Sequence, residues 1–441
     1  MELKQALRLS NFPRLALVGA GGKTTAMFRL ARELIPPVVV CASTHLAVEQ
    51  IRLADHHFIL KNIEDTSFLQ KSPLSGVNLL TGPVEGERTT GLTFDVFEWL
   101  NRYCDYHSNA LLIEADGSRR LPLKAPADHE PAIPDFVDTV VVVAGLSGLG
   151  KPLTSEWVHR PERFASLSGL SLGQTITPQA LAQVLSHPQG GLKGIPTKAR
   201  RVALINQVDT PELEIIARGM VNQLLPEYHG VVIAALKNES YGEAVHSVHE
   251  PVAGIILAAG EARRFGQPKQ LLPWKGKPLV WHAARKALEA GLAPVVVVSG
   301  AYTDELMPVL SDLPVMLVHN PNWSNGQGTS VASGVKALSS KVGAAVFLLA
   351  DQPQIPVHLL HLLVKAHAET LSPIIAPRID NQLANPVLFD RFVFNDLSNL
   401  SGSAGGRQLF SSYPITWVDW DDPSIFLDID TFDDYEQLLS R

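Results

Sequence analysis

Short apolar runs alternate with helix-length amphipathic segments along almost the whole chain, and this alternation constrains the fold more than any other feature. The runs are continuously apolar, which is typical of strands buried on both faces of a parallel α/β sheet. The expected strands are 15–18, 38–40, 111–114, 140–144, 202–205 and 231–234, followed by 254–257, 295–299, 316–319, 345–349 and 373–376.

The pattern restarts near residue 251, after a polar segment, Asn238–Glu250, that we interpret as a linker or as the end of a domain. The chain has 441 residues, and domains of about 150 residues would make two or three of them. We therefore predict two α/β domains, at residues 1–245 and 252–441.

Composition excludes several classes of protein. Hydrophobic residues make up 46% of the chain and charged residues 18%, which excludes disorder along its whole length. The formal charge of −7 argues against a nucleic-acid partner or a polybasic membrane anchor. The two cysteines, Cys41 and Cys104, form no C-x-x-C pair. No apolar stretch approaches the length of about 20 residues that spans a bilayer, so we expect a cytoplasmic protein.

In the second half, a predicted strand runs into a turn of small residues and then into basic residues. Residues 254–274 read G-I-I-L-A-A-G-E-A-R-R-F-G-Q-P-K-Q-L-L-P-W. Small side chains after a parallel strand let backbone N–H groups approach a nucleotide closely. We predict that the turn binds nucleotide through Leu257, Ala258, Ala259 and Gly260. Arg264 and Lys269 would supply cations to a triphosphate, and we predict both as catalytic residues.

This segment resembles the N-terminal signature of the MobA/MocA-like nucleotidyltransferases, L-A-x-G-x-S-x-R-x-G-x-x-K. Three further blocks resemble that family: N-P-N-W-S-N-G-Q-G-T-S at 320–330, F-L-L-A-D-Q-P at 347–353 and F-L-D-I-D-T-F-D-D-Y-E-Q-L at 426–438. The D-Q-P, N-P-x-W and L-A-A-G forms resemble the molybdenum cofactor cytidylyltransferase branch. The resemblance implies a Rossmann-like fold of the nucleotide-diphospho-sugar-transferase type.

The resemblance also implies a reaction, in which CMP passes from CTP to the phosphate of the molybdopterin cofactor and pyrophosphate leaves. Mg²⁺ prefers oxygen ligands, and Asp351 and Asp430 are the candidate ligands, with Asp428 a weaker one. Asp351 is also a predicted catalytic residue. Each of these aspartates could instead cap the helix that follows it. The candidate substrate-binding residues are Asn320, Gly326, Ser330 and Asn385.

One block departs from the family. Relatives often have G-D-x-G-A-R where this chain has G-S-A-G-G-R at 402–407. Two alternatives therefore stay open at this point. The chain could be an NTP-driven carrier or chaperone for molybdenum cofactor, with a degenerate transferase domain. It could also be a nucleotidyltransferase that acts on a sugar phosphate.

The first half contains a glycine-rich loop. Residues 15–25 read L-A-L-V-G-A-G-G-K-T-T, a strand, a turn and then G-K-T at a helix start. The spacing is two residues shorter than the usual P-loop form, G-x-x-x-x-G-K-[ST]. We predict a P-loop NTPase-like parallel sheet whose loop binds ATP or GTP through Gly19, Gly21, Gly22, Lys23, Thr24 and Thr25. The Thr24 hydroxyl is a candidate Mg²⁺ ligand.

Two further segments in the first half suit a nucleotide site. L-L-I-E-A-D at 111–116 resembles a Walker B strand, so Asp116 or Glu114 is a candidate Mg²⁺ ligand; the alternative is a salt-bridge pair at the end of a surface strand. N-Q-V-D at 206–209 resembles the guanine-reading N-K-x-D, which leaves ATP and GTP both open. We expect a solvated loop, rather than an anion site, to hold Arg119, Arg120, Lys124 and His129.

The polar, proline-rich segment 117–135, together with 141–153 and 158–164, resembles the YqeC family. The resemblance covers about residues 5–240 and implies an accessory role for a selenium-dependent hydroxylase. It implies a pathway rather than a reaction. Both halves thus resemble factors for one enzyme class, and a molybdenum hydroxylase apoenzyme is the implied protein partner.

Overall fold

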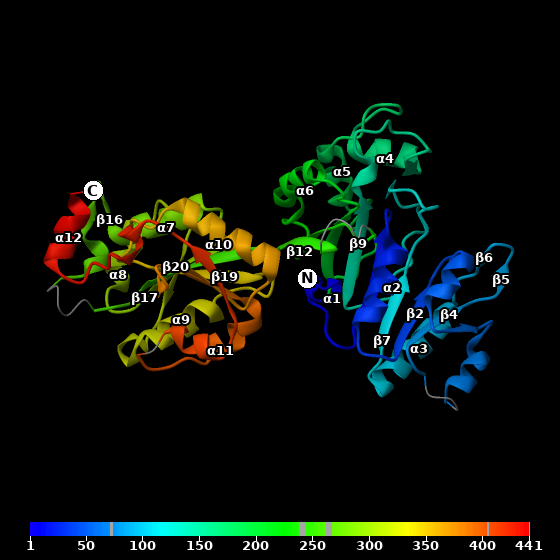
Figure 1. Ribbon diagram of the computed structural model, residues 1–441, viewed down its shortest axis with the longest axis horizontal. Helices are drawn as coiled ribbons and strands as arrows, with labels where there is room; N and C mark the ends of the chain where they lie inside the picture. Colours follow the sequence, from blue (N-terminus) through cyan, green and yellow to red (C-terminus); the bar gives the residue numbers. More distant parts are fainter. Residues whose placement is uncertain (71–73, 238–242, 262–266, 404, 441) are drawn as a thin grey trace. The chain divides into compact units, whose positions relative to one another are not determined.

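The computed structural model of the chain describes residues 1–70, 74–237, 243–261, 267–403 and 405–440. It divides into two compact units, Met1–His249 and Glu250–Arg441. Each unit contains one large, mostly parallel sheet with helices packed against it (Figure 1). The predicted mixed α/β class is therefore confirmed. Within these described ranges, no helix is both long enough and apolar enough to span a membrane.

The sheet of the first unit has the strand order β13-β12-β11-β9-β1-β7-β2-β4-β3. All neighbouring strands run parallel except β12 and β13, which are antiparallel. The strands are β1 (Arg14–Gly19), β2 (Val38–Ala42), β3 (His56–Ile59), β4 (Val77–Thr81), β7 (Ala110–Glu114), β9 (Thr139–Gly145), β11 (Arg200–Asn206), β12 (Gly230–Ala234) and β13 (Val245–His249).

Helices cover both faces of this sheet. Successive side chains of a strand point to opposite faces. In β1, Ala16 and Val18 belong to the core that α3, α5 and α6 complete, while Leu15 and Leu17 face the other side, where α2 packs. The helices are α1 (Leu3–Ala6), α2 (Lys23–Glu33), α3 (Phe94–His107), α4 (Pro161–Ser168), α5 (Pro178–Leu185) and α6 (Pro211–Leu224).

The described part of the segment Asn238–Glu250, residues 243–250, is more ordered than a linker. Val245–His249 forms the edge strand β13, and the Ser247 side chain is fully buried. The alternating burial of this strand explains why its sequence looks polar, since His246 and His249 are only half-buried. The interpretation as a linker was wrong for this part, which ends the first unit.

The sheet of the second unit has the order β18-β17-β14-β19-β22-β20-β21, and β23 pairs with β20. Strand β22 runs antiparallel to both of its neighbours, whereas β18, β17, β14 and β19 are parallel. The strands are β14 (Val252–Ala258), β17 (Val295–Ser299), β18 (Met316–His319), β19 (Ala344–Leu349), β20 (Ile374–Ile379), β21 (Gln382–Leu383), β22 (Val387–Asp390) and β23 (Ile415–Asp419).

The second unit has three layers. Helices α7 and α10 pack on one face of the sheet, and α9 and α11 pack on the other (Figure 1). The helices are α7 (Leu279–Glu289), α8 (Thr303–Leu310), α9 (Gln327–Lys336), α10 (Val357–Thr370), α11 (Phe394–Ser398) and α12 (Phe432–Leu439). The carboxyl ends of β14 and β19 therefore lie side by side at one edge, where parallel sheets bind ligands.

Candidate active site

A cavity of about 280 Å³ lies at the carboxyl ends of β14 and β19. The turn after β14 forms one wall of it. Most of the residues predicted to bind nucleotide or to act in catalysis in this half line the cavity. Its lining residues are Leu257, Ala258, Ala259, Gly260, Lys269, Gln270, Trp323, Gln327, Ser330, Leu349, Ala350 and Asp351.

Lys269 lies between two carboxylates at this cavity. Its ammonium group forms an ion pair with Asp351, directly after β19, and another with Asp430 at 2.9 Å. Burial alone would lower the pKa of Lys269, but the two aspartates outweigh it and raise the pKa above its usual value. The lysine is therefore positively charged at neutral pH, and the two carboxylates converge on one point.

The helix-capping alternatives for these aspartates are wrong. Helix α10 begins at Val357 with Pro356 at its N-cap, several residues after Asp351. Helix α12 is capped by Thr431, whose side chain accepts a hydrogen bond from the Asp434 N–H. Asp351 and Asp430 are thus free of any capping role.

The weaker candidate, Asp428, points to the same cluster but is held by a neighbour. Gln352 donates a hydrogen bond to its carboxylate at 2.5 Å. Burial, followed by the charge of Asp351, raises the pKa of Asp428 above its usual value. Asp428 is therefore less ready to carry a negative charge than an exposed aspartate.

Two predicted substrate-binding residues contact each other. The Asn320 amide is buried and donates to Ser330 at 3.0 Å and to Thr329 at 2.8 Å. Ser330 lines the cavity, but Asn320 is absent from its lining. Asn320 therefore fixes the start of α9 against the end of β18.

Gly326 precedes α9 with a φ of +111°. A Cβ atom there would lie 2.3 Å from the Gly402 carbonyl oxygen. The same carbonyl accepts a hydrogen bond from the Gly328 N–H at 3.0 Å. Gly402, the first residue of the G-S-A-G-G-R block, thus packs directly on the start of α9, and glycine at 326 is required by this close approach.

Two predicted residues lie apart from the described cavity. Asn385 lies just before β22. Because Phe347 of β19 pairs with Val387 of β22, Asn385 lies beside the carboxyl end of β19, but it does not line the cavity. Arg264 lies outside the described residues. The sequence did not predict the lining residues Gln270, Trp323 and Gln327. The N-P-N-W-S-N-G-Q block was the only signal for Trp323 and Gln327.

In the first unit, the glycine-rich loop joins β1 to α2. Gly19, Gly21 and Gly22 have φ values of +94°, +79° and +130°. A Cβ atom on Gly21 would lie 2.3 Å from the backbone nitrogen of Gly145. The loop therefore needs glycine for its conformation and for its contact with β9, and it places Lys23, Thr24 and Thr25 in the first turn of α2.

The predicted charged residues of this loop meet the Walker B-like strand. The Lys23 ammonium group lies 3.2 Å from Asp116 and 3.7 Å from Glu114, and the Thr24 hydroxyl donates to Glu114 at 2.7 Å. Burial would lower the pKa of Lys23, but Asp116 and Glu114 outweigh it and raise that pKa. Burial raises the pKa of Glu114. The two carboxylates are buried, so the alternative of a salt-bridge pair at the end of a surface strand is wrong.

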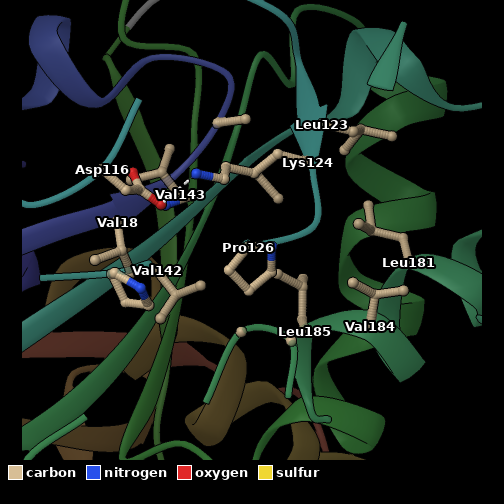
Figure 2. Close-up of a pocket in the computed structure, with 16 residues that line it drawn as sticks. Val18, Asp116, Leu123, Lys124, Pro126, Val142, Val143, Leu181, Val184 and Leu185 are labelled. Atoms are coloured by element: carbon tan, nitrogen blue, oxygen red, sulfur yellow. Dashed lines mark hydrogen bonds and ion pairs between the residues drawn. The ribbon is translucent and has the colours of Figure 1, made fainter. Parts of the chain in front are cut away.

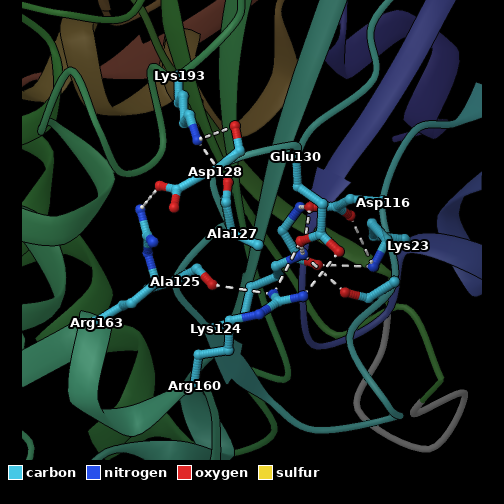
Figure 3. Close-up of polar contacts among 12 residues, drawn as sticks. Lys23, Asp116, Lys124, Ala125, Ala127, Asp128, Glu130, Arg160, Arg163 and Lys193 are labelled. Atoms are coloured by element: carbon cyan, nitrogen blue, oxygen red, sulfur yellow. Dashed lines mark hydrogen bonds and ion pairs between the residues drawn. The ribbon is translucent and has the colours of Figure 1, made fainter.

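This cluster extends into a chain of buried charges (Figure 3). Lys124 donates to Asp116 at 2.7 Å and to Glu130 at 2.8 Å, and Arg160 binds Glu130 through two hydrogen bonds of 2.9 Å. Burial would raise the pKa of Glu130, but Arg160 and Lys124 lower it to about 2. The expected solvated loop is wrong for Lys124, because its charge has carboxylate partners that sequence alone did not reveal.

A second cavity is lined by Asp116 and Lys124 and by Gly19 and Ala20 of the glycine-rich loop (Figure 2). It is lined mainly by apolar side chains, including Val142, Leu181 and Leu185. Its volume of about 30 Å³ is enough for about one water molecule. This cavity is too small for a nucleotide.

The N-Q-V-D segment supports the loop. The buried Asn206 amide donates to the Gly21 carbonyl at 2.7 Å and accepts from the Leu236 N–H at 3.1 Å. Its hydrogen bonds thus tie the glycine-rich loop to the ends of β11 and β12. Among the described residues of the whole chain, no three His, Cys, Asp or Glu side chains form a ready metal-binding group.

Fold and sites together define a protein with two α/β units, each with lysine and carboxylates gathered at a loop after a parallel strand. Two family models match the chain: the YqeC protein over residues 15–162 and the MobA-like NTP transferase domain over residues 254–416. The chain belongs to both families, with a YqeC domain followed by a MobA-like NTP transferase domain.

Curated relatives match each half separately. The uncharacterized protein YqeC of Escherichia coli is 33% identical over 48% of this chain and 82% of its own length. Nicotine blue oxidoreductase of Paenarthrobacter nicotinovorans is 32% identical over 43% of this chain and 96% of its own length. A probable molybdenum cofactor guanylyltransferase of Bacillus mycoides is 33% identical over 20% of this chain and 44% of its own length.

Proposed function

We propose that the second unit transfers CMP from CTP to the phosphate of the molybdopterin cofactor and releases pyrophosphate. The observation that carries the proposal is the convergence of Lys269, Asp351 and Asp430 beside the L-A-A-G turn. A relative named for molybdenum cofactor guanylyl transfer supports the acceptor. Alanine at 259, where guanylyltransferases more often have glycine, favours CTP.

The reaction needs positioning and cations rather than a covalent intermediate. An oxygen of the acceptor phosphate attacks the α-phosphorus of CTP and forms a new phosphoanhydride bond. The bond from the α-phosphorus to the bridging oxygen of the β-phosphate breaks. Pyrophosphate leaves with that oxygen, and no further reactant is required.

The residues of the site have separate roles in this proposal. The backbone of residues 257–260 holds the nucleotide, and Lys269 supplies a positive charge to the phosphates. Asp351 and Asp430 fit Mg²⁺, because two carboxylates that already converge on one cation offer the oxygen ligands it prefers. When bound, the metal ion neutralises charge on the phosphates. We assign Arg264 as a further cation.

The acceptor would bind at the start of α9. Ser330 lines the cavity and receives a hydrogen bond from buried Asn320, so the pair presents a fixed hydroxyl group. Gly326 allows the loop before α9 to pack closely, and Asn385 lies beside the end of β19. We propose these four residues as the acceptor-binding set.

Pyrophosphate release tests the proposal. Purified protein with Mg²⁺ and molybdopterin cofactor is assayed with CTP, GTP, ATP and UTP, and a sugar 1-phosphate serves as a competing acceptor. We expect CTP-selective release, lower by about 10²–10³-fold in Lys269→Ala and in Asp351→Asn. Lys341→Ala, which removes an exposed lysine of the same unit, is the control.

Two results would decide against transfer to molybdopterin. Release only with the sugar phosphate would assign a different acceptor. No release with any nucleotide, from folded protein and active cofactor, would favour a carrier that delivers cofactor to a hydroxylase apoenzyme. In that case Asp351→Asn should leave cofactor delivery unchanged.

We propose that the first unit binds ATP or GTP with Mg²⁺ at Gly19, Gly21, Gly22, Lys23, Thr24 and Thr25, with Thr24 and Asp116 as metal ligands. The glycine conformations and the start of α2 support this, because the first N–H groups of a helix have no partners within it. Fluorescent ATP and GTP analogues test binding. Thr24→Ala should weaken it about tenfold with Mg²⁺ present and have little effect with EDTA.

The matched control for this experiment is Thr197→Ala, which removes an exposed threonine of the same unit. Equal binding by Thr24→Ala and Thr197→Ala with Mg²⁺ present would contradict the metal role of Thr24. No binding of either analogue by the unaltered chain would contradict the nucleotide site itself.

A further inference from the structure

The two acidic residues of the C-terminal segment reach the second site from a stretch of chain with little regular structure. Between β23, which ends at Asp419, and α12, which begins at Phe432, the regular structure is one short 3₁₀ turn, Pro423–Phe426. Asp430 nevertheless lies 2.9 Å from Lys269, which is 161 residues away in sequence. Something must therefore hold this segment against the carboxyl end of β19.

Two glutamines make that contact. Gln352 donates its amide N–H groups to the Asp428 carboxylate at 2.5 Å and to the Ile425 carbonyl at 3.4 Å. Gln354 donates to two further carbonyls of the same segment, at 2.7 Å and 3.1 Å. Both follow Asp351 by only one and three residues, so they link the two halves of the acidic cluster.

The side-chain amides of both glutamines contact the segment through their N–H donors and not through their oxygens. Gln352 is only 3% exposed, and the side-chain oxygens of both glutamines are buried without a hydrogen-bond partner in the described parts of the chain. A buried acceptor without a partner destabilises a protein, because it has lost its hydrogen bonds to water. Only the donor contacts to the C-terminal segment offset that cost.

We propose that Gln352 and Gln354 are positioning residues that hold the C-terminal segment so that Asp430 meets Asp351 and Lys269. Buried Ile425 and Ile429 anchor the same segment in the core, but apolar contacts do not fix where a carboxylate points. The two amides do so, because hydrogen bonds are directional. This inference rests on the proposed function of that site.

Gln352→Leu is the main test, because it keeps the size of the side chain and removes its donors. We expect hydrogen exchange at backbone amides 424–430 to become at least tenfold faster. We expect the affinity for Mn²⁺, measured by electron paramagnetic resonance on the protein alone, to fall by about 10–100-fold. In the transfer assay, the Mg²⁺ concentration for half-maximal rate should rise more than kcat falls.

Two further variants sharpen the test. Gln352→Glu replaces a donor with a carboxylate facing Asp428 and should loosen the segment further. Gln354→Leu should give the same changes as Gln352→Leu, to a smaller extent, since it leaves the contact to Asp428 in place. Gln437→Leu, on an exposed position of α12, is the matched control and should resemble the unaltered chain.

Unchanged exchange at 424–430 together with unchanged Mn²⁺ affinity in Gln352→Leu would overturn the inference. An unaltered chain that binds no Mn²⁺ would overturn it as well. Both measurements use no nucleotide and no acceptor. They therefore separate a failure of this inference from a failure of the proposed transfer reaction, which the pyrophosphate assay alone decides.

Discussion

Lys23 and Lys269 each lie between two carboxylates, but they differ in burial. The Lys23 side chain is 2% exposed and that of Lys269 is 24% exposed. Both lysines follow a loop after a parallel strand in their own unit. Removal of a buried charge leaves its partners unpaired in a medium of low polarity, while exposed partners regain water. The same arrangement should therefore have different energetic consequences in the two units.

The first prediction compares Lys23→Ala with Lys269→Ala. Lys23→Ala leaves Glu114 buried without its cation and Asp116 with Lys124 alone, so it should lower the free energy of unfolding of the first unit by about 3–5 kcal/mol. Lys269→Ala should lower that of the second unit by about 1 kcal/mol, because Asp430 is 58% exposed. Urea unfolding followed by circular dichroism measures both. Equal losses would contradict the role assigned to burial.

Glu130 gives a prediction about pH. Its pKa is about 2 in the folded chain, below the ordinary value of 4.5, so the folded state favours the charged form. This stabilisation is present in full above pH 4.5 and is lost as the pH falls toward 2. At pH 7, Glu130→Ala should lower the free energy of unfolding by about 3 kcal/mol.

The difference between Glu130→Ala and the unaltered chain should then shrink between about pH 4.5 and pH 2, which urea unfolding across that range will show. Glu156→Ala, at an exposed position of the same unit, is the control. A difference that stays constant down to pH 2 would show that the charge of Glu130 is not what stabilises the fold.

At the scale of elements, the turn between β1 and α2 depends on glycine for two separable reasons. Gly21→Ala would place a Cβ atom 2.3 Å from the backbone of Gly145, at a φ of +79°. Gly86→Ala shares the positive φ of +59° but meets no atom within 4 Å. Gly86→Ala should lower the free energy of unfolding by about 1–2 kcal/mol. Gly21→Ala should lower it by about 1–3 kcal/mol more than that. Thermal unfolding measures the difference; similar losses would mean that the loop moves freely away from β9.

The strands were the most predictable elements, because continuous apolar runs mark strands buried on both faces. Every expected strand overlaps a strand of the structure. Two missed strands, β4 and β22, are buried inside their sheets, so burial alone did not make every strand predictable. The missed strands β3 and β13 are edge strands, where one side is open to solvent and the apolar run is broken. Hydrophobicity along the chain cannot signal such strands, since their backbone pairing, rather than their side chains, places them in the sheet.

Candidate site residues were predictable where a motif is continuous in sequence, and less so where the fold brings distant segments together. Lys269 and Asp351 came from two separate motifs, and the structure places them in contact. The partners of Lys124 had no signal, because Glu130 lies on an irregular loop. The buried pair of His367 and Asp390, at 2.7 Å, joins α10 to the end of β22 and was equally invisible to sequence spacing.

At the scale of the whole molecule, each unit has its own sheet and its own apolar core. A ligand that binds the folded form of one unit should stabilise that unit alone. At a free concentration of 100 times its Kd, a ligand raises the free energy of unfolding of its unit by about 2.7 kcal/mol. For a unit of about 200 residues, that corresponds to a rise in Tm of about 5–10 °C.

Differential scanning calorimetry of the full chain tests this independence. We expect two unfolding transitions, with Mg²⁺ and CTP raising the Tm of one and Mg²⁺ with ATP or GTP raising the Tm of the other. Asp351→Asn should abolish only the rise in Tm caused by CTP, and Thr24→Ala should reduce only the rise caused by ATP or GTP. The two variants thus assign each transition to its unit. A single transition that both ligands raise together would mean that the two units unfold as one.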